Sequence, residues 1–291
     1  MTIAKSKLAR TLASGRLAIT AECLPPASPD AVAVKKLAAA LPSNLDAVVV
    51  PDNPDEIHAS ALACASILVG EGRETVLSMV TRDRNRIALE SDALGAAALG
   101  IGAILCLSGD HQSLGARPQA AGVYDIDSIQ LTQFVKGLKL PEMLVGAVAH
   151  PYQQPLEPNL VRLKKKIAAG ADFLLTQAVF DLAGFTKWMD AVRAAGLDKQ
   201  VAILASVLPL ASVEQAKALE KKQTYGPVGE GVIARLGAAA DAAKEGVAIA
   251  AATAAQLKAI PGVRGIHILS GGCESLAATV IQEAGLALNE S

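Results

Sequence analysis

AILCLSGDH, residues 103–111, holds the pattern that decides the fold. Five apolar residues, 103–107, are followed directly by a serine, a glycine, a carboxylate and a histidine. A short run that is apolar on both faces is typical of a strand in a parallel sheet covered by helices. The abrupt change to polar residues indicates that side chains with a possible chemical role stand where this strand ends.

Similar apolar segments recur along the whole chain, at 18–24, 46–50, 75–80, 144–149, 172–177, 201–207 and 265–269. Amphipathic or Ala-rich stretches of helical period lie between them, and several of these end at a glycine. Strand and helix therefore alternate eight times. This predicts an α/β fold of the (β/α)8 TIM barrel type, because eight strands close a parallel sheet around an interior that side chains fill. A doubly wound sheet is the alternative.

Composition and charge narrow the class of protein. No linker rich in Pro, Gly or Ser separates the repeats, so we expect one domain over residues 1–291, with extra helical material at 211–258 before the last strand. The 27 Lys and Arg residues balance 28 Asp and Glu residues, which gives no field that would attract nucleic acid. The longest apolar stretch, 246–257, is too short to cross a bilayer, so no membrane span is expected.

The cysteines indicate the compartment. They lie far apart without Cys-x-x-Cys spacing, at Cys23, Cys64, Cys106 and Cys273. The N-terminus also lacks the charged-then-apolar order of a signal peptide, so the sequence predicts a reduced, cytoplasmic protein. A closed barrel could bring three of the cysteines around zinc, but small buried thiols are common core residues. The histidines add no metal spacing, and we expect no metal site.

Glu22 is the most informative polar residue at a strand end. It lies inside AITAECLPP, so its carboxylate must face either the barrel mouth or the packed interior. A buried carboxylate without a partner tends to take up a proton, which suits a general acid near neutral pH. An ion pair with a lysine or arginine near the barrel end explains its position equally well.

Two further strand ends carry side chains that could form hydrogen bonds with a ligand. Gly109 allows the backbone to turn or to approach a flat ligand, and Asp110 then presents an acceptor at the mouth. An ordinary Asx turn or helix cap also explains a Gly-Asp pair. Gln177 offers a donor and an acceptor that suit the edge of a heterocycle, unless it caps the helix that begins near Asp181.

A cluster of basic residues follows the fifth strand. Arg162, Lys165 and Lys166 share one face of a predicted helix, because they are spaced at i, i+3 and i+4. They could hold a pyrophosphate, although a solvated helix face is the commoner explanation for such a run. His150, beside Pro151, stands at the end of the strand, where either ligand contact or plain loop structure is open.

Three blocks of sequence resemble one known family. They are AECLPP at 21–26, TRDRNRIALESDALGAAALGIGAILCLSGD at 81–110, and GADFLLTQAVFD at 170–181. These blocks resemble the first-strand, fourth-strand and sixth-strand segments of methylenetetrahydrofolate reductases. The LKKKIAAG run and the Leu-Pro after the seventh strand fall in register, so the resemblance extends over nearly the whole chain.

The resemblance implies a (β/α)8 barrel that reduces 5,10-methylenetetrahydrofolate to 5-methyltetrahydrofolate. NAD(P)H would supply the hydride, and in most members a flavin, expected here as FAD, carries it. Glu22 matches the acid that helps to open the five-membered ring, Asp110 the carboxylate beside flavin and pterin, and Gln177 the pterin contact. The resemblance assigns to the cofactor region Met79, Ser108, Gly109, Asp110, His150, Asn159, Lys165 and Lys166, and it places Cys273 beside the folate.

The chain also departs from the family pattern. Met79 stands where a histidine is usual, Ser108 where an arginine precedes Gly-Asp, and Cys273 where an arginine approaches the folate. Gly146 and Pro51 replace a tyrosine and a threonine. The pterin end of the site is thus better preserved than the flavin end, which leaves FMN or no flavin open.

Three functions remain as alternatives. The first is a flavin-dependent reductase. The second is a flavin-independent reductase in which the nicotinamide passes hydride directly to the substrate. The third is a folate- or pterin-binding subunit that needs an electron-transfer or methyltransferase partner, and a homo-oligomer is compatible with each. An aldolase-like barrel is the fallback.

Overall fold

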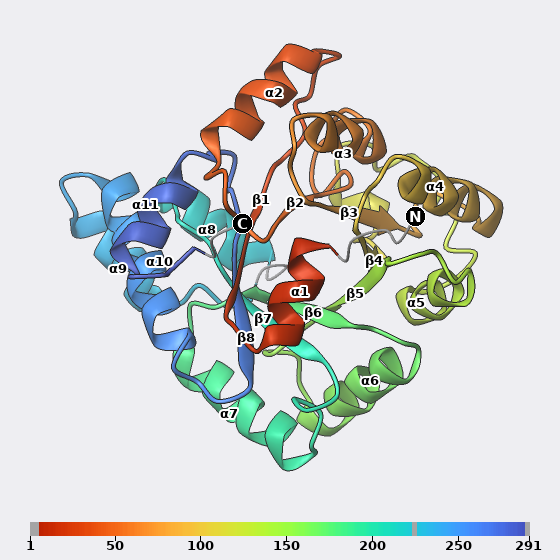
Figure 1. The fold of residues 1–291 in the computed structure, drawn as a ribbon. Coiled ribbons are helices and arrows are strands. Elements are labelled where there is room, and N and C mark those ends of the chain that lie inside the picture. Colours follow the sequence, from red (N-terminus) through yellow and green to blue (C-terminus); the bar gives the residue numbers. More distant parts are fainter. Residues whose placement is uncertain (1–5, 223–225, 289–291) are drawn as a thin grey trace.

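A computed structural model describes residues 6–222 and 226–288 of the chain. Its eight strands are all parallel and form a closed barrel in chain order (Figure 1). The strands are β1 (Ala18–Glu22), β2 (Ala47–Val50), β3 (Thr75–Val80), β4 (Ala103–Leu107), β5 (Leu144–Ala149), β6 (Phe173–Ala178), β7 (Ala202–Val207) and β8 (Val263–Ile268). The predicted (β/α)8 barrel is confirmed, and the alternative of an open doubly wound sheet is wrong.

The helices surround this barrel (Figure 1). They are α1 (Lys7–Ser14), α2 (Ala31–Ala40), α3 (Ala61–Gly70), α4 (Arg86–Ala98), α5 (Ser128–Gly137), α6 (Leu156–Ala168), α7 (Leu182–Ala194), α8 (Val213–Lys222), α9 (Glu230–Ala238), α10 (Ala242–Leu257) and α11 (Leu276–Glu283), with a short 3-10 helix at Gln112–Leu114. No described helix is long and apolar enough to cross a membrane. The predicted extra helical material at 211–258 is confirmed as α8, α9 and α10. The outermost residues of the predicted domain, 1–5 and 289–291, lie outside the described part.

Strand side chains alternate between two cores. One set, which includes Val49, Leu105 and Phe173, fills the barrel interior. The other set, which includes Ile104 and Cys106, packs against the helices outside. Both faces of each strand are buried, which explains why the strands read as continuous apolar runs.

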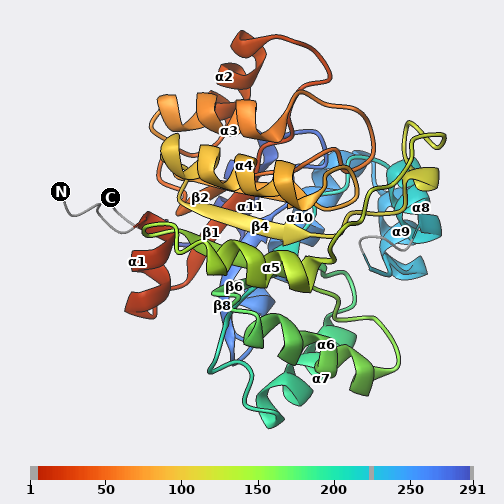
Figure 2. The ribbon, with the colours of Figure 1, turned by 90° about the vertical axis from the view of Figure 1, so that its right-hand side faces the viewer.

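The helix α1 covers the amino-terminal end of the barrel. Leu8 of α1 is buried in the interior cluster. Asp46, just before β2, accepts hydrogen bonds from the Ile19 amide at 2.7 Å and from the Thr11 hydroxyl at 2.7 Å. Figure 2 shows α1 at one end of the molecule and α8 and α9 at the other, where the arrow of β4 points. The barrel is therefore covered at one end, and its mouth lies at the carboxyl ends of the strands.

Gly246 allows α10 to pack against the chain that follows β7. A Cβ atom at this position would lie inside van der Waals distance of the Leu210 carbonyl group. We predict that Gly246→Ala lowers the free energy of unfolding by about 3 kcal/mol, because main-chain atoms cannot move aside as a flexible side chain can. Urea denaturation would measure the change.

Gly95 provides the matched control in α4. A Cβ atom there would meet only the Leu62 side chain, at 3.9 Å. Gly95→Ala should therefore raise the free energy of unfolding by about 0.5–1 kcal/mol through helix propensity. Equal effects of the two substitutions would contradict the packing account of Gly246.

Candidate active site

A cavity of about 320 Å³ opens at the carboxyl ends of the strands. This is the size range of small-molecule sites, which combine apolar walls with a few convergent polar groups. The apolar walls are formed by Val49, Val80, Leu105, Leu107, Val148, Leu175 and Leu269. Polar side chains from nearly every strand end complete the lining, and they include several of the site residues expected from the sequence.

Glu22 lines this cavity at the end of β1. Its Oε1 atom accepts hydrogen bonds from the Ser270 amide at 3.2 Å and from the Ser270 hydroxyl at 2.9 Å. Burial raises its pKa, the Ser270 hydrogen bonds oppose that rise, and the negative charges of Glu274 and Asp55 add to it. Among the described residues Glu22 forms no ion pair, so the ion-pair interpretation of its position is wrong. The site therefore favours a carboxyl group that keeps its proton.

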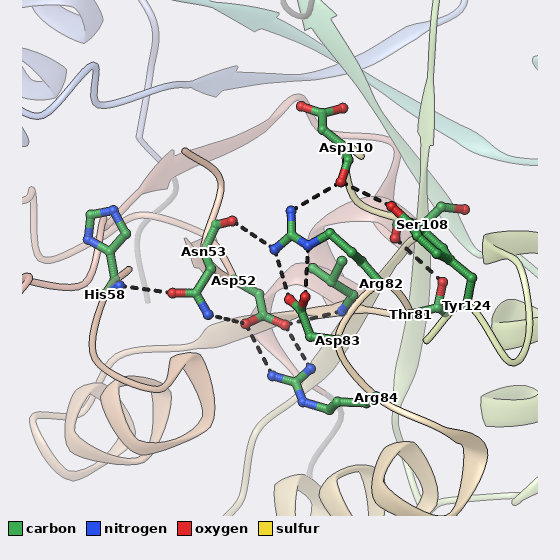
Figure 3. A network of polar contacts seen from close by, with 11 residues as sticks. Asp52, Asn53, His58, Thr81, Arg82, Asp83, Arg84, Ser108, Asp110 and Tyr124 are labelled. Atoms are coloured by element: carbon green, nitrogen blue, oxygen red, sulfur yellow. Dashed lines mark hydrogen bonds and ion pairs between the residues drawn. The ribbon is translucent and has the colours of Figure 1, made fainter. Parts of the chain in front are cut away.

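Asp110 is fixed through its main chain at the end of β4 (Figure 3). Its carbonyl oxygen accepts hydrogen bonds from Arg82 Nη1 at 3.3 Å and from the Tyr124 hydroxyl at 3.1 Å. Gly109 precedes it with φ of +80°, and a Cβ there would collide with Val80. The glycine is thus required by both the turn and the close approach of β3.

The Asp110 carboxylate itself remains available. It accepts no hydrogen bond and forms no ion pair within the described residues, and it lines the cavity. Partial burial and the charge of Asp55 raise its pKa, whereas the charges of Arg82 and Lys222 oppose the rise. A rigid main chain that carries an unengaged carboxylate is suited to accept a hydrogen bond from a ligand.

The ends of β2 and β3 are joined by a buried ion pair. Both Asp52 oxygens accept hydrogen bonds from the Arg84 guanidinium, at 2.7 and 3.1 Å. The Asp52 side chain is only 1% exposed, and it also accepts the Val80 amide at 3.2 Å. This pairing explains why PDNPD and TRDRN are so polar: they hold neighbouring strand ends together beneath the mouth.

Gln177 enters the cavity from β6, beside an irregularity in the sheet. The pairing register between β6 and β7 shifts between Leu175 and Ala178. Thr176 stabilises this bulge, because its hydroxyl accepts the Ser206 amide at 3.0 Å while the Ser206 hydroxyl donates to the Thr176 carbonyl. Bulges next to functional sites commonly redirect side chains. Asp181 caps α7 by accepting the Gly184 amide at 2.9 Å, so the interpretation of Gln177 as that cap is wrong.

The α6 side of the cavity is cationic. Arg162 and Lys166 of α6 both line it. Arg162 has no hydrogen bond or ion pair with any described residue, and Lys166 donates only to the Val148 carbonyl. Burial and the neighbouring Arg162 charge lower the pKa of Lys166 to about 8. Two cations without an acidic partner favour an anionic group on the ligand.

His150 stands between this cationic side and Gln177. Both residues line the same cavity, and the Gln177 side chain is near enough to raise the pKa of His150 slightly. Burial and then the charges of Lys166 and Arg162 lower its pKa to about 4, so the ring is neutral near pH 7. His150 and Gln177, which the resemblance assigns to cofactor and substrate respectively, are therefore neighbours in the cavity lining.

Comparison with known proteins identifies the family. The family model described as methylenetetrahydrofolate reductase matches residues 7–285. The chain belongs to the methylenetetrahydrofolate reductase family. It is 30% identical over 118 residues to the 5,10-methylenetetrahydrofolate reductase of Escherichia coli, which covers 40% of this chain and 38% of that protein. It is 26% identical over 175 residues to a probable methylenetetrahydrofolate reductase (NADPH) of Caenorhabditis elegans, covering 59% of this chain and 26% of that protein. The matched parts are thus well under half the length of these relatives.

Solved structures support the fold of this family member. An uncharacterized protein from Clostridium thermocellum, solved with two copies of 5-methyl-5,6,7,8-tetrahydrofolic acid, aligns with a TM-score of 0.69 and 13% identity, over 96% of this chain and 100% of that chain. A 2,3-dimethylmalate lyase aligns with a TM-score of 0.53 and 14% identity, over 97% of this chain and 87% of that chain. At such identities the likeness concerns the barrel.

Two residues that the family resemblance assigns to the cofactor region lie elsewhere. Met79 is fully buried in the layer between the sheet and the helices, because Ser78 and Val80 occupy the inward positions of β3. Lys165 is exposed on α6 and does not line the cavity, whereas its neighbour Lys166 does. The cavity therefore offers no contact to Met79 or Lys165, and their predicted cofactor contacts stay predictions.

Asn159 and Cys273 also differ from the expectation. Asn159 is buried and orders the loop after β5, since its amide donates to the carbonyls of His150 and Gln153 while its oxygen accepts the Trp188 indole N–H at 3.3 Å. Cys273 is exposed and lies outside the cavity lining, with its Sγ atom 3.4 Å from the Ser275 hydroxyl. Its predicted folate contact stays a prediction. Ser108 and Gly109 do line the cavity, and the Ser108 hydroxyl accepts the first amide of α5, from Ser128, at 3.1 Å.

Several residues that were given no role at the sequence level also line the cavity. Ser78, Arg82, Ser206 and His267 all line the cavity, and His267 Nδ1 lies 3.0 Å from the Thr20 hydroxyl. Alternation within β7 and β8 limits Ser206 and His267 to one of two faces, but the choice of the inward face needs the tertiary structure. No described cluster of His, Cys, Asp and Glu could hold a metal ion.

The environment of Glu22 predicts a pH-dependent cost in stability. Because burial raises its pKa in the folded state, ionisation at higher pH destabilises the fold, and a neutral amide escapes that cost. Glu22→Gln should raise the free energy of unfolding relative to the wild type at pH 8. This gain should vanish as the pH falls below the ordinary glutamate pKa of about 4.3.

Urea denaturation at a series of pH values would measure the difference. Glu90→Gln, on the exposed surface of α4, is the control and should show no such trend. A gain that is constant from pH 4 to pH 8 would contradict the raised pKa of Glu22.

Proposed function

We propose that this protein reduces 5,10-methylenetetrahydrofolate to 5-methyltetrahydrofolate with hydride that comes from NAD(P)H. The observation that carries the proposal is the buried Glu22 carboxyl group, which shares one cavity with the unengaged Asp110 carboxylate and the Gln177 amide. Family membership supports the reaction. The C. thermocellum protein of similar fold, which binds the proposed product, supports the ligand class.

Glu22 supplies the proton that the reaction needs. When the five-membered ring of the substrate opens to the N5 iminium ion, the departing N10 atom must be protonated. A carboxyl group whose pKa is raised by burial still carries its proton closer to neutral pH, which is the requirement for a general acid. Ser270 holds one oxygen of Glu22, and the other oxygen, which has no partner in the described part of the chain, can face the substrate.

Asp110 and Gln177 orient the pterin. An unengaged carboxylate accepts hydrogen bonds from the N–H groups of a heterocycle, and an amide pairs with either a donor or an acceptor. Both groups stand on rigid supports, Asp110 on its clamped turn and Gln177 on the bulge of β6. Such rigidity matters because hydride transfer requires the reacting atoms to be held in near-contact and aligned.

The chemistry of the lining fits a flavin. The aliphatic walls accept a flat ring, and Arg162 and Lys166 provide unpaired cations for the phosphate of its tail, with His150 beside them. Bound there, a flavin, FAD or FMN, would take hydride from NAD(P)H and pass it to the substrate. The flavin-independent reductase is the second candidate, and it is favoured by the position of Met79 and Lys165 away from the cavity.

We predict that Glu22→Gln keeps folate binding but lowers the rate of methylenetetrahydrofolate reduction about 10²- to 10⁴-fold, the usual contribution of a general acid. The amide preserves the shape and removes the transferable proton. Steady-state oxidation of NADH or NADPH would measure the rate, and calorimetry would measure folate binding. Wild-type turnover by this variant would refute the acid role of Glu22.

An absorbance spectrum of the purified protein decides between the two reductases. We expect flavin bands in near-stoichiometric amount, and release of FAD or FMN on heating. Lys166→Gln should then weaken flavin retention about tenfold or more, because it removes a cation from the cavity. A colourless protein that still reduces the substrate would establish the flavin-independent reaction, and a colourless protein active only with a second protein would support the partner-dependent subunit.

A further inference from the structure

One arginine joins three of the loops around the cavity mouth. Arg82 follows β3 and is only 9% exposed. Its guanidinium donates to both Asp83 oxygens at 2.9 and 2.8 Å, to the Asn53 carbonyl at 3.1 Å and to the Asp110 carbonyl at 3.3 Å. Figure 3 shows this group between the chain segments that follow β2 and β4. A planar guanidinium can serve acceptors in several directions at once, which an ammonium group cannot do with the same geometry.

The main chain of Arg82 adds two more links to the β4 side. Its amide donates to the Ser108 carbonyl at 3.0 Å, and its carbonyl accepts the Val123 amide at 2.7 Å. The segment after β4 therefore contacts Arg82 twice, at Ser108 where it begins and again at Val123. This fixes the Gly109–Asp110 turn relative to β3.

The main-chain carbonyl and the side-chain carboxylate of Asp110 therefore differ in their contacts. Its carbonyl oxygen is held by Arg82 and Tyr124, whereas its carboxylate has no partner in the described chain. Gly109 leaves little freedom for an alternative turn, since a Cβ there would lie 3.2 Å from Arg82 Cβ and closer still to Val80.

We propose that Arg82 is the positioning residue of this site: by binding the Asp110 carbonyl and tying together the β2, β3 and β4 loops, it aims the Asp110 carboxylate into the cavity. Its charge also favours the ionised carboxylate that must accept a hydrogen bond from the ligand. The kinetic part of this proposal rests on the proposed reductase function, and the titration described below does not.

The charged and titratable groups that face Asp110 come from four segments. Asp55 of the β2 loop raises the pKa of Asp110, and Arg82 and Lys222 lower it, with Arg82 the stronger of the two. Tyr124 interacts with the same carboxylate, and burial raises its pKa above the usual value. Removal of the Arg82 charge should therefore raise the pKa of Asp110.

Three variants separate the charge of Arg82 from its shape. Arg82→Gln removes the charge, whereas Arg82→Lys keeps the charge but cannot reach all the acceptors together. Arg86→Gln removes a cation from the neighbouring start of α4, where Arg86 pairs with Asp125 at the surface, and so controls for net charge. Circular dichroism would establish that each variant is folded, and Arg82→Lys still tests the proposal if Arg82→Gln does not fold.

The first measurement is the titration of Asp110 by NMR of protein labelled with carboxyl-¹³C aspartate, with Asp110→Asn used to assign the signal. We expect a higher pKa in Arg82→Gln than in the wild type, and wild-type values in Arg82→Lys and Arg86→Gln. An unchanged Asp110 titration in Arg82→Gln, or an equal rise in Arg86→Gln, would overturn the electrostatic role.

The second measurement is reductase kinetics over a range of pH. Arg82→Lys should lower kcat/KM about tenfold to a hundredfold at unchanged Asp110 pKa, because a displacement of about 1 Å has effects of that size. In Arg82→Gln the acid limb of the pH profile should also move to higher pH. Wild-type kinetics in Arg82→Lys would overturn the positioning role. Failure of the wild type to reduce the folate would instead refute the proposed function, and the titration would then decide on Arg82 alone.

Discussion

The structure depends on the closure of its parallel sheet. A strand at a sheet edge exposes unpaired N–H and C=O groups, and the pairing of β1 with β8 removes the last such edge. Closure also fixes the direction of every strand, so all eight carboxyl ends meet at one mouth. Residues as distant in sequence as Glu22 and Ser270 become hydrogen-bonded neighbours for this reason. The cavity, its acid and its cations are consequences of that geometry.

The upper interior of the barrel is polar, which is costly unless each group finds a partner. The structure meets this requirement locally: Thr20 pairs with His267, and Thr176 pairs with Ser206. These contacts link neighbouring strands just below the cavity and hold the bulge beside Gln177. The floor of the site is thus both hydrophilic and rigid, as precise placement of a flat substrate requires.

The cavity has two electrostatic halves. Glu22 and Asp110 face it from β1 and β4, whereas Arg162 and Lys166 face it from α6. The cavity therefore favours an anionic ligand group beside α6 and a hydrogen-bond donor beside Asp110. Burial reduces the charge on both sides, because it raises the pKa of Glu22 and lowers that of Lys166 to about 8.

The sequence by itself determined the barrel, because apolar runs of strand length alternate with helical periods, and it located Glu22, Asp110 and Gln177 at strand ends. It did not determine which face of its strand each residue occupies. Met79 differs from the inward-facing Ser78 by a single residue, which reverses the face of a strand. Only the tertiary structure showed that Ser270 reaches Glu22, and that Arg82 holds the turn of another strand. Those contacts join loops far apart in the chain, and their partners are set by how the closed barrel brings strand ends together.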